Sequence, residues 1–120
     1  MEGSSSAGRC CVAYTVREED TNPRGALHGG ASATLVDLVT TIAMVDDHED
    51  SVKRLGVSVD MNLSYLGAAK LNDDLLIDGW VVKKGRKLAF TECTIKNKQS
   101  QKILVAARHT KYIQQLEPTN

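Results

Sequence analysis

The chain lacks a net charge, because 15 lysines and arginines balance 15 aspartates and glutamates among its 120 residues. A protein that binds nucleic acid or an anionic membrane surface generally carries a surface of one sign. The balance excludes both as general partners and leaves only local basic clusters to consider. At this length we expect one domain with a single core.

Cysteine is scarce and poorly arranged for a disulfide framework. There are three cysteines, an odd number, and Cys10 and Cys11 are adjacent. The sequence has no CxxC pair and no Cys/His spacing typical of zinc, and the acidic run at 46–50 lacks the ligand spacing and turn glycine of a hard-cation loop. We therefore expect reduced thiols, no bound metal, a polar loop at 46–50 and a cytoplasmic protein.

Long hydrophobic runs and targeting signals are also missing. The most apolar stretch, residues 26–45, fails as a membrane span because it contains His28, Asp37, two glycines and several hydroxyl groups. Residues 1–8 contain mostly small and polar types. We expect them to be a disordered leader before a single domain over residues 9–120.

The stretch that fails as a span is the most informative part of the chain. Its residues are apolar or small on every side, which predicts a buried helix over about Gly30–Val45 with Asp37 as its one formal charge. Burial disfavours the ionised form of a carboxyl group, which is how a protein makes a general base. Gly29 and Gly30 lie at the helix start, where unpaired N–H groups and the helix dipole favour an oxyanion. The stretch thus combines an anion hole with a base two turns later.

Strands flank this helix in the sequence. Residues 9–17 are rich in β-forming types, and residues 57–65 alternate apolar and polar side chains with a period of two. Later strands are predicted over residues 75–83, 88–96 and 102–113. A helix without a polar face needs a strongly curved antiparallel sheet wrapped around it, and a partner subunit over what remains. This arrangement is the α+β hotdog fold.

Three segments carry a resemblance to a known family. They are Asn22-Pro-Arg-Gly-Ala-Leu-His-Gly-Gly30, Ala33-Thr-Leu-Val-Asp37 and Gly56-Val-Ser-Val-Asp-Met-Asn-Leu-Ser-Tyr65. Together they resemble the hotdog acyl-CoA thioesterases of the phenylacetate-degradation type, over roughly residues 9–113. The chain departs from that family at Ala68 and Asn72, where a proline and a glycine are expected. Family members also usually carry a helix and a strand before the region matching Arg9.

The resemblance implies a catalytic site. Asp37 would activate the attacking water with the help of Ser58, while Asn22 and the backbone N–H of Gly29 would hold the thioester carbonyl, with His28 nearby. Donors placed for the tetrahedral oxyanion typically contribute about 3–4 kcal/mol each. The sequence has no GxSxG elbow and no Cys/His signature, so the alternative route is direct attack by the Asp37 carboxylate.

The resemblance also implies contacts with coenzyme A. A basic hairpin would bind its phosphates, and a segment after the 57–65 strand would line the pantetheine and nucleotide path. The residues implied are Ser58, Tyr65, Leu66, Gly67, Ala68, Ala69, Lys70, Lys83, Lys84, Gly85, Arg86, Lys87, Leu88, Lys111 and Tyr112.

Each site residue also has a purely structural interpretation. Asp37 could cap a backbone group, Ser58 could be an outward strand residue, and the basic hairpin could be only a solvated turn. The glycine pair could be no more than a tight turn. His28 could orient its loop without touching substrate.

The function implied is hydrolysis of an acyl-CoA thioester to free acid and CoA. No metal or redox cofactor is expected, because CoA is part of the substrate. Medium- to long-chain fatty and aryl acyl groups are the candidates. The alternatives are a hotdog acyl-CoA hydratase or dehydratase and a non-catalytic acyl-CoA-binding or protein-binding module. The glycine pair after His28 and the later Asp37 favour hydrolysis, and the resemblance also allows mitochondrial association.

Helix geometry predicts self-association. Gly29 and Asp37 are eight residues apart, or about 12 Å along one helix axis. A bound carbonyl and its attacking water need their donor and base much closer together than that. We therefore expect a dimer in which Asp37 and Ser58 come from one subunit and Asn22, His28 and Gly29 from its two-fold mate. The family resemblance also implies that such dimers could associate into a dimer of dimers.

Overall fold

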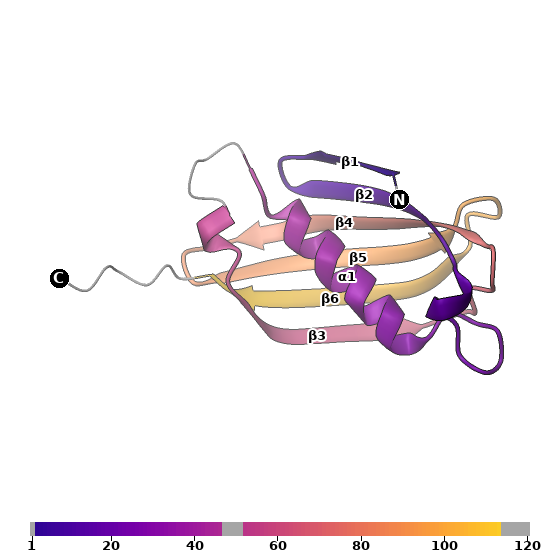
Figure 1. The fold of residues 1–120 in the computed structure, drawn as a ribbon. Coiled ribbons are helices and arrows are strands. Elements are labelled where there is room, and N and C mark those ends of the chain that lie inside the picture. The colour runs from indigo at the N-terminus through magenta and orange to yellow at the C-terminus, as the bar shows by residue number, and fades with distance from the viewer. Residues whose placement is uncertain (1, 47–51, 114–120) are drawn as a thin grey trace.

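One helix lies across a six-stranded antiparallel sheet in the computed structural model, which describes residues 2–46 and 52–113. The sheet order is β1 (Glu2–Ser6), β2 (Arg9–Thr15), β4 (Asp74–Lys84), β5 (Leu88–Asn97), β6 (Ile103–Tyr112) and β3 (Val57–Tyr65). The helix α1 spans Gly29–Ala43, and two short 3-10 helices, η1 (Glu18–Asp20) and η2 (Val52–Arg54), lie in connections. Figure 1 shows α1 on one face of the sheet, with β1 and β3 at opposite edges. The predicted hotdog fold is confirmed.

One face of α1 forms the core together with the sheet. Leu35, Val36, Val39 and Ala43 recur at helical spacing and are buried. The helix packs closely against β4 at Gly79, where a Cβ atom would lie 3.0 Å from Val39 Cγ1. A larger residue at this crossing would require the Val39 side chain to shift.

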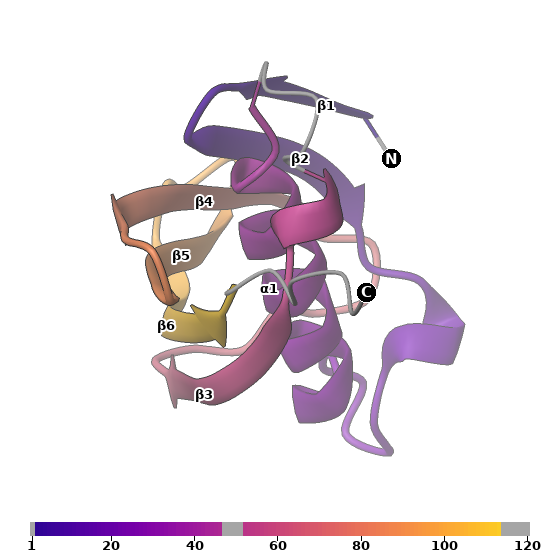
Figure 2. The ribbon, with the colours of Figure 1, turned by 90° about the vertical axis from the view of Figure 1, so that its left-hand side faces the viewer.

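The opposite face of α1 is exposed in the single chain. Seen along the sheet in Figure 2, the strands curve around α1 from β2 to β3 and leave one side of the helix without a covering strand. Leu38 and Ile42 are exposed there, and the side chain of Asp37 keeps 52% of its accessible surface. The sheet thus covers one face of α1 only, and the exposed face is the part for which cover by a partner subunit was expected.

The edge strand β3 continues this uncovered surface. On one side β3 pairs with β6, with a bulge between Ser58 and Asp60. On its other side no strand of the described residues pairs with it. Val57 and Val59 are 65% and 59% exposed. An open edge with apolar side chains is a surface on which another strand can pair. The exposed sides of α1 and β3 thus form one partly apolar face.

The first residues differ from expectation. We expected residues 1–8 to be a disordered leader, whereas Glu2–Ser6 forms β1 and pairs with β2 from Glu2↔Ala13 to Ser6↔Arg9. The serines and glycine of this segment bring little apolar surface. An edge strand can still form from such residues, because ladder hydrogen bonds use backbone groups alone.

Asn72, one of the two departures from the family pattern, takes a conformation that suits glycine. Its φ is +70°, in the left-handed region that asparagine tolerates better than most residues. The replacement of the expected glycine is therefore compatible with the turn.

Two expectations fall partly on residues outside the described ranges. Of the polar loop expected at 46–50, only Asp46 is described, and the end of the predicted domain, residues 114–120, is not. Within the described residues, no helix combines the length and the apolar character needed to cross a membrane.

Candidate active site

A buried histidine connects α1, β3 and β6 at the middle of the helix. His109 on β6 has no accessible surface, and its Nε2 lies 2.7 Å from Ser58 Oγ while its Nδ1 lies 2.8 Å from Thr40 Oγ1. Thr40 donates its own proton to the Val36 carbonyl at 2.7 Å, so it accepts from Nδ1–H. Nε2 therefore accepts the Ser58 proton, which leaves the lone pairs of Ser58 Oγ available to a further donor.

Asp37 lies beside this histidine. Its Oδ1 is 3.9 Å from His109 Nε2 and 3.4 Å from Thr41 Oγ1, which donates to it. Burial is the largest influence on His109 and lowers its pKa, although the Asp37 carboxylate acts in the opposite direction. A neutral His109 fits the hydrogen bonds described above. Asp37, Ser58 and His109 therefore form a group in which a carboxylate lies near a serine hydroxyl that already donates its proton to His109.

A second group of predicted residues lies at the start of α1. Asn22 Oδ1 accepts from the backbone N–H groups of Arg24, at 2.9 Å, and Ala26, at 3.2 Å. These bonds fix the orientation of the amide and leave Asn22 Nδ2 as a donor that can bind a ligand. The backbone of the same turn is closed by Asn22 N–H donating to the Ala26 carbonyl at 2.8 Å.

His28 and Gly29 complete this second group. His28 caps the helix, because its Nδ1 accepts from the Gly30 N–H at 2.9 Å. This bond agrees with the structural interpretation of His28 and occupies only the Nδ1 atom of its ring. Gly29 is the first helical residue, and its N–H has no hydrogen-bond acceptor among residues 2–46 and 52–113.

The segment Tyr65–Lys70 lies against the helix start, as a shared binding path requires. Tyr65 donates its hydroxyl proton to the Gly29 carbonyl at 3.0 Å, and the Leu27 N–H donates to the Ala69 carbonyl at 2.7 Å. Most of the segment is exposed, with Ala69 buried. The structure therefore brings Asn22, His28, Gly29 and Tyr65–Lys70 together within one chain.

The structure does not bring the two groups to each other. Gly29 and Asp37 are eight residues apart in the continuous helix α1, which corresponds to about 12 Å of axial rise. Ser58 and Tyr65 lie near opposite ends of β3. One chain thus holds the donor group and the base group at separate places, as helix geometry predicted.

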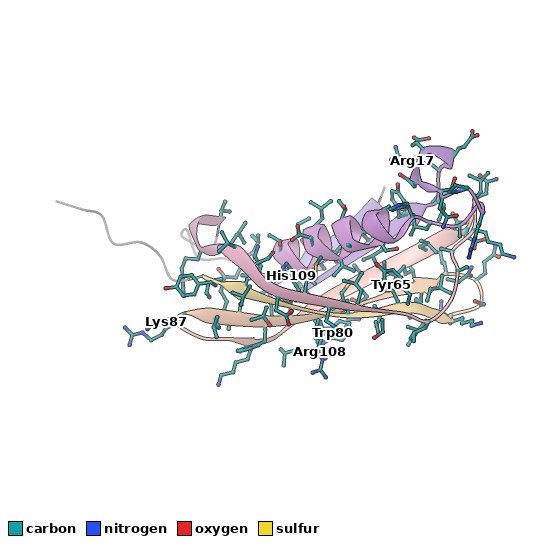
Figure 3. All side chains as sticks on the ribbon, turned by 90° about the horizontal axis from the view of Figure 1, so that it is seen from below. Arg17, Tyr65, Trp80, Lys87, Arg108 and His109 are labelled. Atoms are coloured by element: carbon teal, nitrogen blue, oxygen red, sulfur yellow. The ribbon has the colours of Figure 1, made fainter. Side chains whose placement is uncertain are left out.

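The basic residues divide between two faces. Lys83, Arg86 and Lys87 are exposed in the hairpin that joins β4 and β5, at the end of the sheet where Figure 3 labels Lys87. Lys84 instead donates to the Met44 carbonyl at 3.2 Å and pairs with Asp46 at 3.6 Å, at the end of α1. Lys111 is buried on the helix side of β6. Of the remaining residues implied for CoA, Gly85 and Leu88 are half-buried and Tyr112 is exposed.

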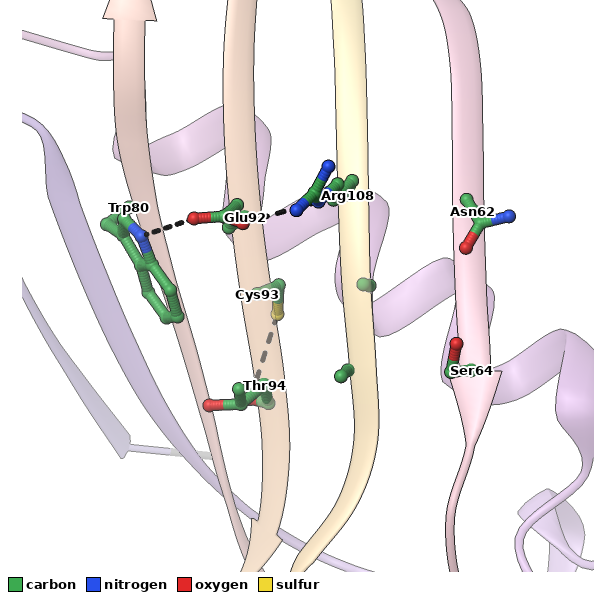
Figure 4. A pocket seen from close by; sticks show the side chains of 9 residues that line it. Asn62, Ser64, Trp80, Glu92, Cys93, Thr94 and Arg108 are labelled. Carbon is green, nitrogen blue, oxygen red and sulfur yellow. Dashed lines mark hydrogen bonds and ion pairs between the residues drawn. The ribbon is translucent and has the colours of Figure 1, made fainter.

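A shallow depression on the other face of the sheet contains none of the predicted site residues. Its volume is about 250 Å³, and Trp80, Glu92 and Arg108 form a row across it. Glu92 accepts from Trp80 Nε1 at 3.3 Å and pairs with Arg108 at 3.4 Å (Figure 4). In Figure 3, Trp80 and Arg108 project away from α1, whereas His109 lies between the sheet and the helix.

Sequence reasoning did not single out His109, Thr40 or Thr41. The signal for His109 was present: in the predicted strand 102–113 it occupies the same face as Ala107 and Lys111, which a period of two turns inward. A histidine and a lysine at inward positions are costly to bury and indicate a polar network. The two threonines are ordinary helix residues until the position of β6 is known.

The burial of neutral His109 predicts a specific pH dependence of stability. Its folded pKa is depressed below the ordinary value of 6.5, so its contribution is complete above that pH. Below pH 6.5 the unfolded chain takes up a proton that the folded chain resists, at a cost approaching ~1.4 kcal/mol per pH unit. In urea titrations between pH 7.5 and 5, the free energy of unfolding of His109→Gln should fall less steeply than that of the wild type. An identical pH dependence of the free energy of unfolding in the two proteins would contradict a buried, neutral His109.

The comparisons with known proteins identify the family of this chain. A thioesterase superfamily profile matches residues 24–104. Human acyl-coenzyme A thioesterase 13 is 42% identical over 110 residues, which cover 92% of this chain and 76% of the human protein. The crystal structure of zebrafish thioesterase superfamily member 2 has a TM-score of 0.85 at 42% identity, covering 92% of this chain and 78% of that one.

A more distant structure carries a ligand. The protein smu.793 from Streptococcus mutans, crystallised bound to acetyl-CoA, has a TM-score of 0.82 at 27% identity and covers 96% of this chain and 88% of its own. The profile alone spans more than half of the sequence, and the human relative is matched over most of its length. This chain belongs to the thioesterase superfamily.

Proposed function

We propose that this protein hydrolyses acyl-CoA thioesters to a free acid and CoA. The observation that carries the proposal is the half-exposed Asp37 carboxylate beside Ser58 and the buried His109. The similarity to human acyl-coenzyme A thioesterase 13 and to a bacterial protein bound to acetyl-CoA supports the choice of substrate.

The hydrogen bonds of Ser58 define how a water molecule would be held. Because Ser58 donates to His109, its oxygen can accept one proton of the water, and Asp37 can accept the other. As the water oxygen bonds to the thioester carbon, Asp37 takes up its proton. The tetrahedral intermediate then expels the CoA sulfur, which takes the proton held by Asp37 as the C–S bond breaks and so restores the carboxylate.

The oxyanion of that intermediate requires donors, and the start of α1 offers two. The Gly29 N–H is unpaired within the described chain and lies at the positive end of the helix dipole. Asn22 presents its Nδ2 because its carbonyl oxygen is engaged by Arg24 and Ala26. Both donors are positioned before substrate arrives, which is the condition for strong transition-state stabilisation.

The two groups meet if two subunits pair through β3. A two-fold axis at the open edge of β3 would run the two copies antiparallel, so that the Ser58 end of one strand lies near the Tyr65 end of the other. The exposed Val57, Val59 and Leu38 would be covered in such a pairing. Asp37 and Ser58 would then face Asn22 and Gly29 of the partner subunit, which gives two sites per dimer; two such dimers could associate further.

The CoA moiety would extend from the site along exposed backbone and basic side chains. The Tyr65–Lys70 segment lies beside the donors and would line the pantetheine path. Lys83, Arg86 and Lys87 are exposed and offer cations to phosphates. Lys84 already pairs with Asp46 and caps α1, so it would contribute less.

Replacing Asp37 by Asn preserves shape and removes the base. We expect kcat to fall by roughly 10²–10⁴ while acyl-CoA still binds. The measurement is free-thiol release on a panel of medium- and long-chain fatty and aryl acyl-CoA esters, with binding measured by calorimetry. Asp78→Asn, which removes a carboxylate paired with Arg9 on the far face, is the matched control. Wild-type turnover by Asp37→Asn, or hydration of an enoyl-CoA without thiol release, would contradict the proposed reaction.

Replacing Lys83 and Arg86 together by Ala tests the phosphate contacts. Such contacts bind ground and transition states alike, so KM should rise by about three- to tenfold with kcat nearly unchanged. An acyl ester of CoA without its ribose phosphate should respond less to the double change. An unaltered KM for intact acyl-CoA would show that the basic hairpin does not bind CoA and is only a solvated turn.

A further inference from the structure

Lys111 is a buried cation on the same face of the sheet as the candidate base. Its residue retains only 5% of its accessible surface, and it is the cross-strand partner of Ser58 in the pairing of β6 with β3. This location differs from that of Lys83, Arg86 and Lys87, which are exposed. Lys111 therefore has a different environment from the side chains that could meet CoA phosphates.

A hydroxyl group links Lys111 to Asp37. Lys111 Nζ donates to Thr41 Oγ1 at 3.0 Å, and Thr41 in turn donates to Asp37 Oδ1 at 3.4 Å. A threonine hydroxyl can accept one proton and donate another, so both bonds can exist together. The chain of bonds fixes one oxygen of the Asp37 carboxylate and leaves the other for water.

Electrostatics supports the same connection. An ammonium group is costly to bury unless a carboxylate compensates it. Within residues 2–46 and 52–113, no carboxylate lies within 4.0 Å of Lys111 Nζ, and Asp37 is the group whose charge acts on it. Burial lowers the pKa of Lys111, whereas the Asp37 carboxylate acts in the opposite direction. The Asp37 carboxylate thus favours the charged form of the buried Lys111 ammonium group.

Other titratable groups around Asp37 and Lys111 have defined roles or no charge. The charge of Asp60 on β3 raises the pKa of His109, and Lys84 on β4 pairs with Asp46. β2 and β5 bring the buried thiols of Cys10 and Cys93, whose pKa values burial raises. His109 is neutral in its hydrogen-bond arrangement. Lys111 is therefore the cation through which the protein can act on the base.

We propose that Lys111 is a positioning residue that acts through Thr41 to hold the Asp37 carboxylate in place. This inference rests on the proposed function, in which Asp37 is the base. It replaces the role that family resemblance implied for Lys111, a contact with CoA. The two roles predict different kinetic changes, so they can be separated by experiment.

The test compares kcat and KM for the full chain, measured by thiol release on the preferred acyl-CoA of the panel. In Lys111→Met, loss of the group that holds Thr41 and Asp37 in place should lower kcat by about tenfold. KM should change by less than about twofold. Thr41→Val should reproduce the loss, while Lys111→Arg and Thr41→Ser should recover most of it. Lys102→Met, which removes a charge from the exposed β5–β6 turn, controls for net charge.

Three results would overturn the proposal. A rise in KM with unchanged kcat would make Lys111 a CoA contact. An unchanged kcat in Thr41→Val would remove the link through its hydroxyl group, even if Lys111→Met failed to fold. An equal fall in kcat in Lys102→Met would assign the effect to net charge. If Asp37→Asn retained wild-type turnover, the proposed function would fail first, which distinguishes the two failures.

Discussion

The rise of the α-helix is the constraint on which the rest of this structure depends. It places the donor at Gly29 and the carboxylate of Asp37 about 12 Å apart on a rigid element. Neither group can move toward the other without breaking α1. The uncovered side of α1 and the open edge of β3 lie on the same side of the molecule, where a second copy could supply the missing half of each site.

The depth of α1 on the sheet determines the geometry around the base. Gly79 lets Val39 approach the sheet closely, and Thr40 is then near enough to bond His109 on β6. The same contact orients the ring toward Ser58. A Cβ atom at residue 79 would lie 3.0 Å from Val39 Cγ1 and 3.4 Å from the Thr40 backbone nitrogen, so Val39 would have to shift beside these hydrogen bonds. Core packing and site geometry are thus linked at one crossing point.

The fold was predictable because its signals are periodic and local. An apolar helix and strands with a period of two can be recognised in the sequence, and Asp37 stands out because it interrupts an apolar stretch. The contacts of Asp37 were not predictable. They depend on which residues of β6 face Thr40 and Thr41, and strand register is set by the whole sheet. The sequence suggested that Asp37 is buried, whereas its side chain is half-exposed in the single chain. The apolar composition of a helix does not show whether its own chain or a second subunit covers it.

The most direct test of the shared site mixes two impaired proteins. Asp37→Asn removes the base, and Asn22→Asp removes the amide donor while keeping the oxygen that holds its loop. Unfolded and refolded together, random pairing would make half of the dimers mixed, each with one intact site. We expect thiol-release activity of about a quarter of the wild type. Activity no higher than the mean of the two parents, with subunit exchange confirmed by mass spectrometry, would contradict a site built from two subunits.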